Sequence, residues 1–148
     1  MIRKIWPWGI AAAVWIADRA TKILAPGIPE TGRTLIPGIL GLRYAENRGI
    51  AFSLLSGMPW ITGVLSLAVM LAAFFVLRRK RLPGLPLTGL MMMLGGAAGN
   101  LTDRFMHGFV PDMIEVLFMK FAIFNVADTF LCIGCGLVIL HLFFGEKT

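Results

Sequence analysis

The chain has 148 residues, of which 57% are hydrophobic and only 15% are charged, and its mean hydropathy is +0.80. Soluble domains usually carry about 25% charged residues, so this composition excludes an ordinary soluble domain and a disordered chain. The formal charge of +6 comes without a nucleic-acid-binding motif, so we expect no nucleic-acid partner, and basic residues that mark the cytoplasmic ends of helices.

Four apolar segments are long enough to cross a bilayer, which takes about 20 residues each. The sequence predicts a single polytopic membrane domain over residues 1–148, with spans at about 5–24, 59–77, 85–103 and 124–144. The first segment begins like a secretory signal, but Asp18, Arg19 and Lys22 follow it without a well-placed cleavage site. We therefore expect an uncleaved anchor.

The connection over residues 25–58 is predicted to be an outer loop with structure of its own. Residues 39–44 favour an extended segment and residues 47–49 a turn. Residues 50–55 are short and apolar, which is typical of a helix lying flat on the bilayer surface. This loop is not polar enough to be simply solvated.

The distribution of charge predicts the orientation of the chain. Basic residues gather at 3–4, at 78–81 and at 147, which four spans would place on one face, the cytoplasmic one. Both termini are then cytoplasmic. Seven of the eight acidic residues, all but Glu146, fall at or beyond the outer boundary. Because ionisable groups at membrane depth are costly and usually functional, this sorting predicts a polar site at the outer surface.

The outer end of the third span carries Asn100, Asp103 and Arg104, whose i, i+3, i+4 spacing places them on one helix face. Gly95 and Gly99 precede them as a G-x-x-x-G step, which lets another helix backbone approach closely. An amide at the depth of Asn100 needs hydrogen-bonding partners.

Two aspartates are candidates for acid–base chemistry. Asp128 follows Asn125 by three residues at the start of the fourth span, and Asp112 lies in an apolar stretch of the preceding loop. Taken alone, Asp128 is also compatible with a helix-start carboxylate and Asp112 with a turn cap. Held close together, two carboxylates share one proton and can serve as general acid and general base without a metal.

Other combinations of reactive residues give no site. His107 and His141 are predicted at opposite faces of the membrane, so they cannot share a metal ion. Cys132 and Cys135 form a C-x-x-C within an apolar helix, which we interpret as small packing residues rather than a redox motif. The sequence predicts neither a metal nor another cofactor.

Five blocks in chain order carry a family resemblance: DRATK at 18–22, NRGIAFS at 47–53, GGAAGNLTDR at 95–104, VPDMI at 110–114 and FNVAD at 124–128. They resemble the patterns D-x-x-[ST]-K, N-x-G-x-A-F-S, G-G-x-x-G-N-x-x-D-R, V-x-D-[FY]-I and F-N-x-A-D of the bacterial lipoprotein signal peptidases, or signal peptidase II. The chain departs from the patterns at Met113, where an aromatic residue is usual, and has Pro111 before the aspartate. Met113 is apolar and adaptable enough to pack there.

The resemblance implies an aspartyl endopeptidase of the bacterial inner membrane, with its active site near the periplasmic face. It implies a diacylglyceryl-modified prolipoprotein as substrate, cut just before the lipidated cysteine, with membrane lipid around it and no obligate protein partner. It implies Asp112 and Asp128 as the catalytic pair. Substrate-holding residues are then Asn47, Asn100, Arg104 and Asn125, and supporting residues are Asp18, Lys22 and Asp103.

The fold that this resemblance implies is an all-α membrane protein with four transmembrane helices. A small extracytoplasmic β element and an interfacial helix are expected between the first two helices. Two rival functions remain open from the residues alone: a small proton- or ion-coupled transporter and a non-catalytic membrane scaffold. A transporter would need polar residues through the full depth of the bilayer, and a scaffold would leave the two aspartates unexplained.

Overall fold

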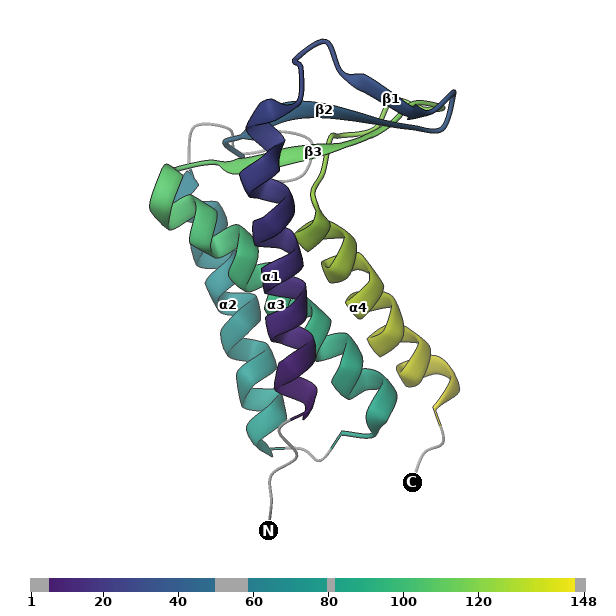
Figure 1. Cartoon of the computed structure of the whole chain (residues 1–148). Helices are drawn as coiled ribbons and strands as arrows, with labels where there is room; N and C mark the ends of the chain where they lie inside the picture. The colour runs from purple at the N-terminus through teal and green to yellow at the C-terminus, as the bar shows by residue number, and fades with distance from the viewer. Residues whose placement is uncertain (1–5, 50–58, 80–81, 146–148) are drawn as a thin grey trace.

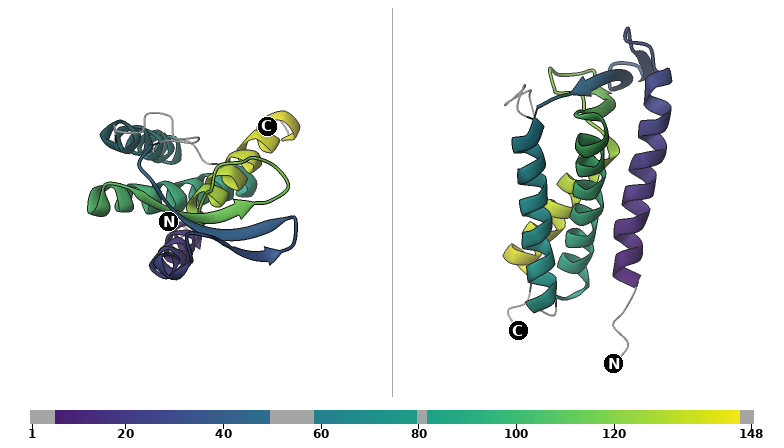
Figure 2. Two further views of the ribbon diagram at one scale, coloured as in Figure 1. Left: turned by 90° about the horizontal axis from the view of Figure 1, so that it is seen from above. Right: turned by 90° about the vertical axis from the view of Figure 1, so that its left-hand side faces the viewer.

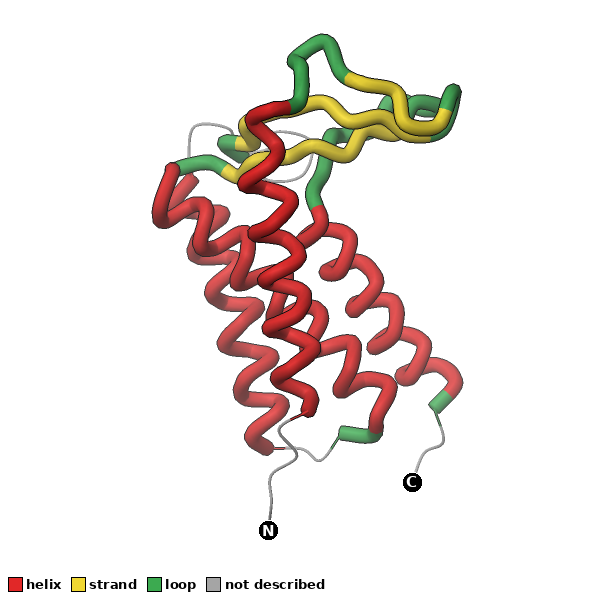
Figure 3. The backbone as a smooth tube through the Cα atoms, in the orientation of Figure 1, coloured by secondary structure: helices red, strands yellow, loops and turns green. Residues whose placement is uncertain are grey.

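The computed structural model describes residues 6–49, 59–79 and 82–145 of the chain. The helices are α1 (Trp6–Leu24), α2 (Pro59–Arg79), α3 (Gly84–His107), α4 (Val126–Phe144) and a short 3-10 helix, η1 (Ala25–Gly27). The strands are β1 (Arg33–Ile36), β2 (Leu40–Asn47) and β3 (Val110–Val116). The long helices lie alongside one another, and the strands cover one end of them (Figures 1 and 3).

Each predicted span overlaps one of these helices. Helix α3 continues past the predicted end to His107, where Gly108 closes it in the left-handed conformation with φ 75°. Helix α4 begins at Val126 because Asn125 is its extended N-cap. In the described part of the chain, α4 is the helix long and apolar enough to cross a membrane, with a hydropathy of 2.0, and Ser66–Leu77 is a shorter apolar stretch.

Helix α3 is the central helix, with α1 and α2 on opposite sides of it (Figure 2). Glycine allows its close contacts. A Cβ on Gly95 would lie 2.5 Å from the carbonyl oxygen of Ala11 in α1, and one on Gly96 would lie 2.6 Å from that of Ala127 in α4. The predicted close approach at Gly95 is therefore confirmed. At Gly99 the space is taken instead by the carboxylate of Asp18.

The three strands form an antiparallel sheet in the order β1-β2-β3. The extended segment predicted at 39–44 is confirmed from Leu40 onward as part of β2, which continues to Asn47, the first residue of the predicted turn. Strand β3 was not predicted, because residues 105–123 read as an outer connection. The expected all-α class with a β element confined to residues 25–58 is therefore wrong in this respect: the chain is mostly helical with a three-stranded sheet.

The pairing of β3 explains why it escaped prediction. Its partner is β2, about 65 residues earlier in the chain, with Ala45 opposite Asp112 and Asn47 opposite Val110. Pro111 has no N–H to donate and lowers the local strand signal. The strand therefore depends on a long-range pairing rather than on local propensity.

Cys132 and Cys135 are exposed on α4. The interpretation that they pack against other helices of this chain is therefore wrong. The helical face that they occupy is turned away from α3, where Gly134 makes the close contact instead. The surface helix expected at 50–55 and the basic residues at 3–4, 80–81 and 147 lie outside the described residues.

Candidate active site

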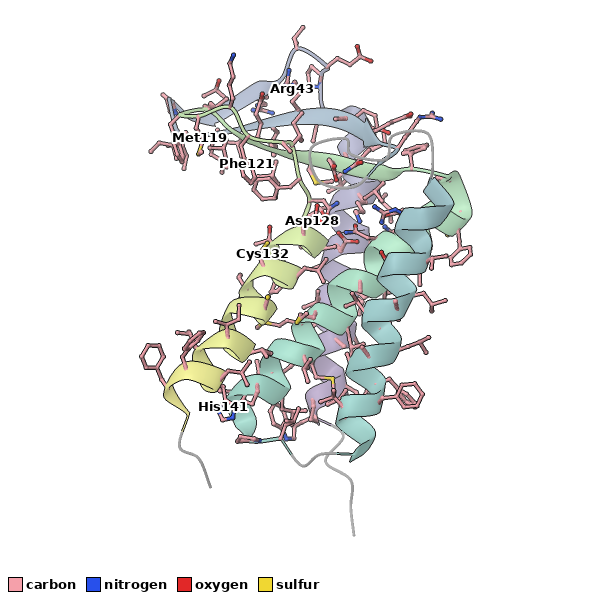
Figure 4. All side chains as sticks on the ribbon, turned by 180° about the vertical axis from the view of Figure 1, so that it is seen from behind. Arg43, Met119, Phe121, Asp128, Cys132 and His141 are labelled. Atoms are coloured by element: carbon pink, nitrogen blue, oxygen red, sulfur yellow. The ribbon has the colours of Figure 1, made fainter. Side chains whose placement is uncertain are left out.

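The predicted polar residues gather where the sheet meets the ends of α1, α3 and α4. Six polar or charged residues are buried in the described chain, and all belong to this end: Asp18, Lys22, Asn100, Asp103, Asp112 and Asn125. Asp128 lies at the same level, at the first turn of α4 beneath the sheet, whereas His141 lies at the opposite end (Figure 4).

A short bridge between β3 and the segment before α4 brings the two aspartates together. The backbone N–H groups of Met113 and Ile114 donate to the carbonyl of Phe124, at 3.0 and 2.8 Å, and Phe124 N donates back to Ile114 O. Asn125 is thereby held beside Asp112. Met113 is buried, so the methionine at this unusual position packs in the interior.

Asn125 connects the two aspartates. Its Nδ2 donates to Asp112 Oδ1 at 2.6 Å, and its Oδ1 accepts from the backbone N–H of Asp128 at 2.9 Å. The carboxylate of Asp128 accepts in return from Asn125 N at 3.3 Å, which completes a capping box. Asp128 is therefore both of the things that its sequence position allows: a carboxylate that caps the start of α4, and a close neighbour of Asp112 through Asn125.

Asn100 contacts the pair from α3. Its Nδ2 donates to Asp128 Oδ1 at 2.8 Å, and its Oδ1 accepts from Asn125 Nδ2 at 3.2 Å. The same oxygen accepts from Lys22 Nζ at 2.8 Å. Asn100 therefore links a buried cation on α1 to a carboxylate on α4.

Lys22 belongs to a buried charge cluster behind the pair. Its ammonium lies 2.8 Å from Asp18 Oδ2 and 2.7 Å from Asp103 Oδ2. Asp18 Oδ1 accepts from the backbone N–H of Ala127 at 3.0 Å, which fastens α1 to the positive end of α4. Arg19 also belongs to this cluster, because its Nη2 pairs with Asp103 Oδ1.

The far side of the pair is formed by the end of β2. Asn47 Nδ2 donates to Asp112 Oδ2 at 2.9 Å, and its Oδ1 accepts from Gly49 N at 3.0 Å. Arg104 Nη2 donates to the carbonyl of Gly49 at 3.2 Å. Asn47 therefore contacts Asp112 directly, whereas Arg104 holds the segment that follows it.

The environment of Asp112 raises its pKa to about 7 from an ordinary 3.8. Burial is the largest cause, and the negative charge of Asp128 is the second. The hydrogen bonds from Asn47 and Asn125 act in the opposite direction. Near neutral pH, Asp112 can therefore both hold and release a proton, as acid–base catalysis requires.

All nine residues that the sequence singled out lie at this end, and they fall into two connected groups. The first group surrounds the aspartates and contains Asn47, Asn100, Arg104, Asp112, Asn125 and Asp128. The second is the ion cluster of Asp18, Lys22 and Asp103. Arg19 was missed, because a residue next to Asp18 on a helix is expected to point about 100° away from it.

A separate cavity of about 720 Å³ lies toward the other end of β3. It is lined by Arg43, Glu115 and residues 116–122, and neither aspartate contributes to it. Arg43 and Glu115 form an ion pair there at 2.7 Å. The side chains of Arg43, Met119 and Phe121 mark this region, above and apart from Asp128 (Figure 4).

Comparison with known proteins gives consistent results. The sequence model of the signal peptidase (SPase) II family matches residues 10–144. The chain is 38% identical over 143 residues to a lipoprotein signal peptidase of Syntrophomonas wolfei, covering 95% of each chain. It is 41% identical over 113 residues to that of Streptococcus thermophilus, covering 76% of this chain and 74% of the other.

Two solved structures share the fold. A bacterial membrane enzyme structure obtained by the in meso method at 2.3 Å resolution superposes with a TM-score of 0.88 and 28% identity, covering 95% of this chain and 89% of the other. A second such structure, at 1.9 Å resolution, gives a TM-score of 0.85 and 28% identity, with 97% and 96% covered.

Proposed function

Because this chain belongs to the signal peptidase II family, we propose that Asp112 and Asp128 are the pair with which it hydrolyses its substrate. The chain is an aspartic-type peptidase that removes signal peptides from prolipoproteins. The observation that carries the proposal for the pair is their connection through Asn125, which contacts both residues with one side chain.

In the proposed mechanism the pair shares one proton. The ionised carboxylate takes a proton from a water molecule, and the water oxygen attacks the scissile carbonyl carbon. The protonated carboxyl then gives its proton to the leaving amide nitrogen as the C–N bond breaks, which produces a new carboxyl group and a new amine. The raised pKa of Asp112, about 7, supports this exchange near neutral pH.

Neighbouring polar groups have positioning roles in this proposal. Asn47, Asn100 and Asn125 orient the two carboxylates, and Arg104 holds the segment after β2 against the site. Asp18, Lys22 and Asp103 fasten the three helix ends together. The substrate class proposed is a diacylglyceryl-modified precursor, cut just before its lipidated cysteine.

The proposed setting is the bacterial inner membrane, with four spans and both termini in the cytoplasm. Helices α1 to α4 contain 19, 21, 24 and 19 residues, each close to the length that a bilayer requires. Large apolar side chains are exposed along them, as on lipid-facing surfaces. The sheet and the aspartates would then lie at the periplasmic face, within reach of water.

The test is cleavage of a diacylglyceryl-modified prolipoprotein by purified protein in detergent with a chelator present. We expect Asp112→Asn and Asp128→Asn each to lower kcat by about 10²–10⁴-fold or more, the range for general acid–base groups. Glu115→Gln removes a carboxylate from the same strand outside the pair, and it should cleave at the wild-type rate.

Wild-type cleavage by a well-folded Asp128→Asn variant would contradict the proposed pair. The unlipidated precursor tests the substrate class in the same assay. Equal cleavage of the lipidated and unlipidated precursors would contradict the proposed substrate while leaving the pair intact.

A further inference from the structure

Arg19 is adjacent in sequence to Asp18, and its side chain joins the same buried charge cluster. The guanidinium reaches α3, where Nη2 donates to Asp103 Oδ1, and it also lies 3.5 Å from Asp18 Oδ2. Its side chain is only 18% exposed. Arg19 is therefore a member of the cluster and not a solvated cation.

The contacts of Lys22 show why a second cation is present. Its ammonium forms ion pairs with Asp18 Oδ2 and Asp103 Oδ2 at 2.8 and 2.7 Å, and it donates a hydrogen bond to Asn100 Oδ1 at 2.8 Å. Its contact with Asp103 is to Oδ2. The other oxygen, Oδ1, accepts from Arg19, so that Lys22 is shared between the two carboxylates and Asn100 without being the only cation beside Asp103.

The 2.8 Å bond from Lys22 orients the Asn100 amide, together with the longer 3.2 Å bond from Asn125 Nδ2 to the same oxygen. Lys22 can only donate, so the carbonyl oxygen of Asn100 must face it. The amide nitrogen of Asn100 then faces Asp128 and donates to its carboxylate at 2.8 Å. A longer Lys22–Asn100 hydrogen bond would leave the amide held by Asn125 alone, and so would loosen one hydrogen bond on the proposed catalytic carboxylate.

The cluster is also balanced in charge. Asp18 and Asp103 carry two negative charges, and Arg19 and Lys22 carry two positive ones, with both carboxylates fully buried. Without Arg19 the cluster would keep one uncompensated negative charge. Buried charges in this state are strongly unfavourable, and Lys22 would be drawn toward the carboxylates and away from Asn100.

We propose that Arg19 is a positioning residue for cleavage, which acts on Asp128 through Asp103, Lys22 and Asn100. The inference rests on the proposed function of the aspartate pair. It assigns to Arg19 two effects: it keeps the Lys22–Asn100 hydrogen bond, and it compensates the charge of the cluster behind the pair.

The sign of the electrostatic effect follows from the charges around the pair. The cations that act directly on the two aspartates are Lys22 on α1 and Arg104 on α3. Behind Lys22 lie the other charged groups of the packed elements, which are Asp18 and Arg19 on α1 and Asp103 on α3. Removing a positive charge makes nearby carboxyls hold protons more tightly. Both limbs of the pH–rate profile should therefore move to higher pH.

The experiment measures kcat, KM and the pH–rate profile of Arg19→Gln with the diacylglyceryl-modified precursor. We expect kcat to fall about tenfold, with KM changed less than twofold, and the profile to move up by about half a pH unit or more. Arg33→Gln makes the same chemical change on the exposed strand β1 and should leave all three quantities at wild-type values.

Two further variants separate charge from loss of structure. Arg19→Lys keeps the charge, so its pH profile should stay at the wild-type position even where kcat falls. Arg19→Gln combined with Asp103→Asn restores a neutral cluster, so its profile should return to that of the wild type. Both measurements use the position of the pH–rate profile along the pH axis. A smaller amount of folded protein lowers the height of this profile but does not shift it.

The outcomes distinguish this inference from the proposed function. No cleavage by the wild type, or wild-type cleavage by Asp128→Asn, overturns the function and the inference with it. Normal function with an unshifted profile in Arg19→Gln overturns the role of Arg19 alone. So does an Arg19→Lys profile that moves as far as that of Arg19→Gln.

Discussion

The side chain of Asn125 belongs to the helix and to the site at once. As N-cap of α4 it accepts from Asp128 N, and a capping interaction of this kind contributes about 1 kcal/mol to stability. Its amide nitrogen is turned to Asp112 and Asn100. The requirement to cap the helix therefore fixes which end of the amide faces the aspartate.

The pKa of Asp112 makes a prediction about stability. Its folded value of about 7 lies above the ordinary 3.8, so the folded state binds the proton more tightly than the unfolded state. The resulting stabilisation is complete below about pH 3.8 and is lost as the pH rises through 7. Between pH 5 and pH 8, the wild type should lose about 2–3 kcal/mol relative to Asp112→Asn, or about 5–10 °C in apparent Tm.

The measurement is thermal unfolding in detergent at several pH values. Asp112→Ala serves as the control, because it removes the same titration together with the hydrogen bonds. Asp112→Ala should be less stable than Asp112→Asn, yet the two variants should show the same dependence of stability on pH. Parallel curves for the wild type and both variants would show that Asp112 titrates at its ordinary value in the folded protein.

Among the elements, α4 packs closely against α3 at two glycine positions, Gly96 of α3, described above, and Gly134 of α4. A Cβ on Gly134 would overlap the carbonyl oxygen of Gly89 and lie 2.8 Å from Met93 Cγ. Gly136, two residues further along α4, has nothing within 4 Å of a Cβ. Replacing each glycine by alanine therefore separates two effects on stability. At Gly134 the change disturbs helix packing, and at Gly136 it changes only helix propensity.

We expect Gly134→Ala to destabilise the protein by about 1–3 kcal/mol through overpacking. Gly136→Ala should be neutral or stabilising by up to about 1 kcal/mol, since alanine favours the helix. Denaturation in mixed micelles, followed by circular dichroism, gives both values. Equal effects at the two positions would contradict the close packing of α3 and α4.

The elements differ in how far the sequence could predict them. Helices α1 to α4 follow from long apolar runs and were found to within a few residues. Strand β3 could not be found, since its pairing partner is remote and Pro111 interrupts the local pattern. The contacts of Asp112 with Asn47 and Asn125 likewise depend on this pairing, so the residue types could be named in advance but not their hydrogen bonds.

At the scale of the whole molecule, the buried polar residues occupy one end. The described parts of α2 and the remote ends of α3 and α4 bury no charged side chain. A transporter requires polar groups along its full path, so this arrangement favours a surface reaction over conduction. The sorting of the acidic residues could be read from the sequence, because charge and span lengths suffice to place them.

The proposed orientation makes the last prediction. Single cysteines are placed at Glu30, exposed between η1 and β1, and at the terminal Thr148, in a background in which Cys132 and Cys135 are serine. With four spans and the sheet outside, a membrane-impermeant maleimide should label Glu30→Cys in intact spheroplasts. It should label Thr148→Cys only after the membrane is permeabilised.

Retained prolipoprotein cleavage identifies the variants that are correctly folded. Labelling of both positions from outside would require an odd number of spans. Labelling of Thr148→Cys alone would mean the opposite orientation, with the aspartates at the cytoplasmic face.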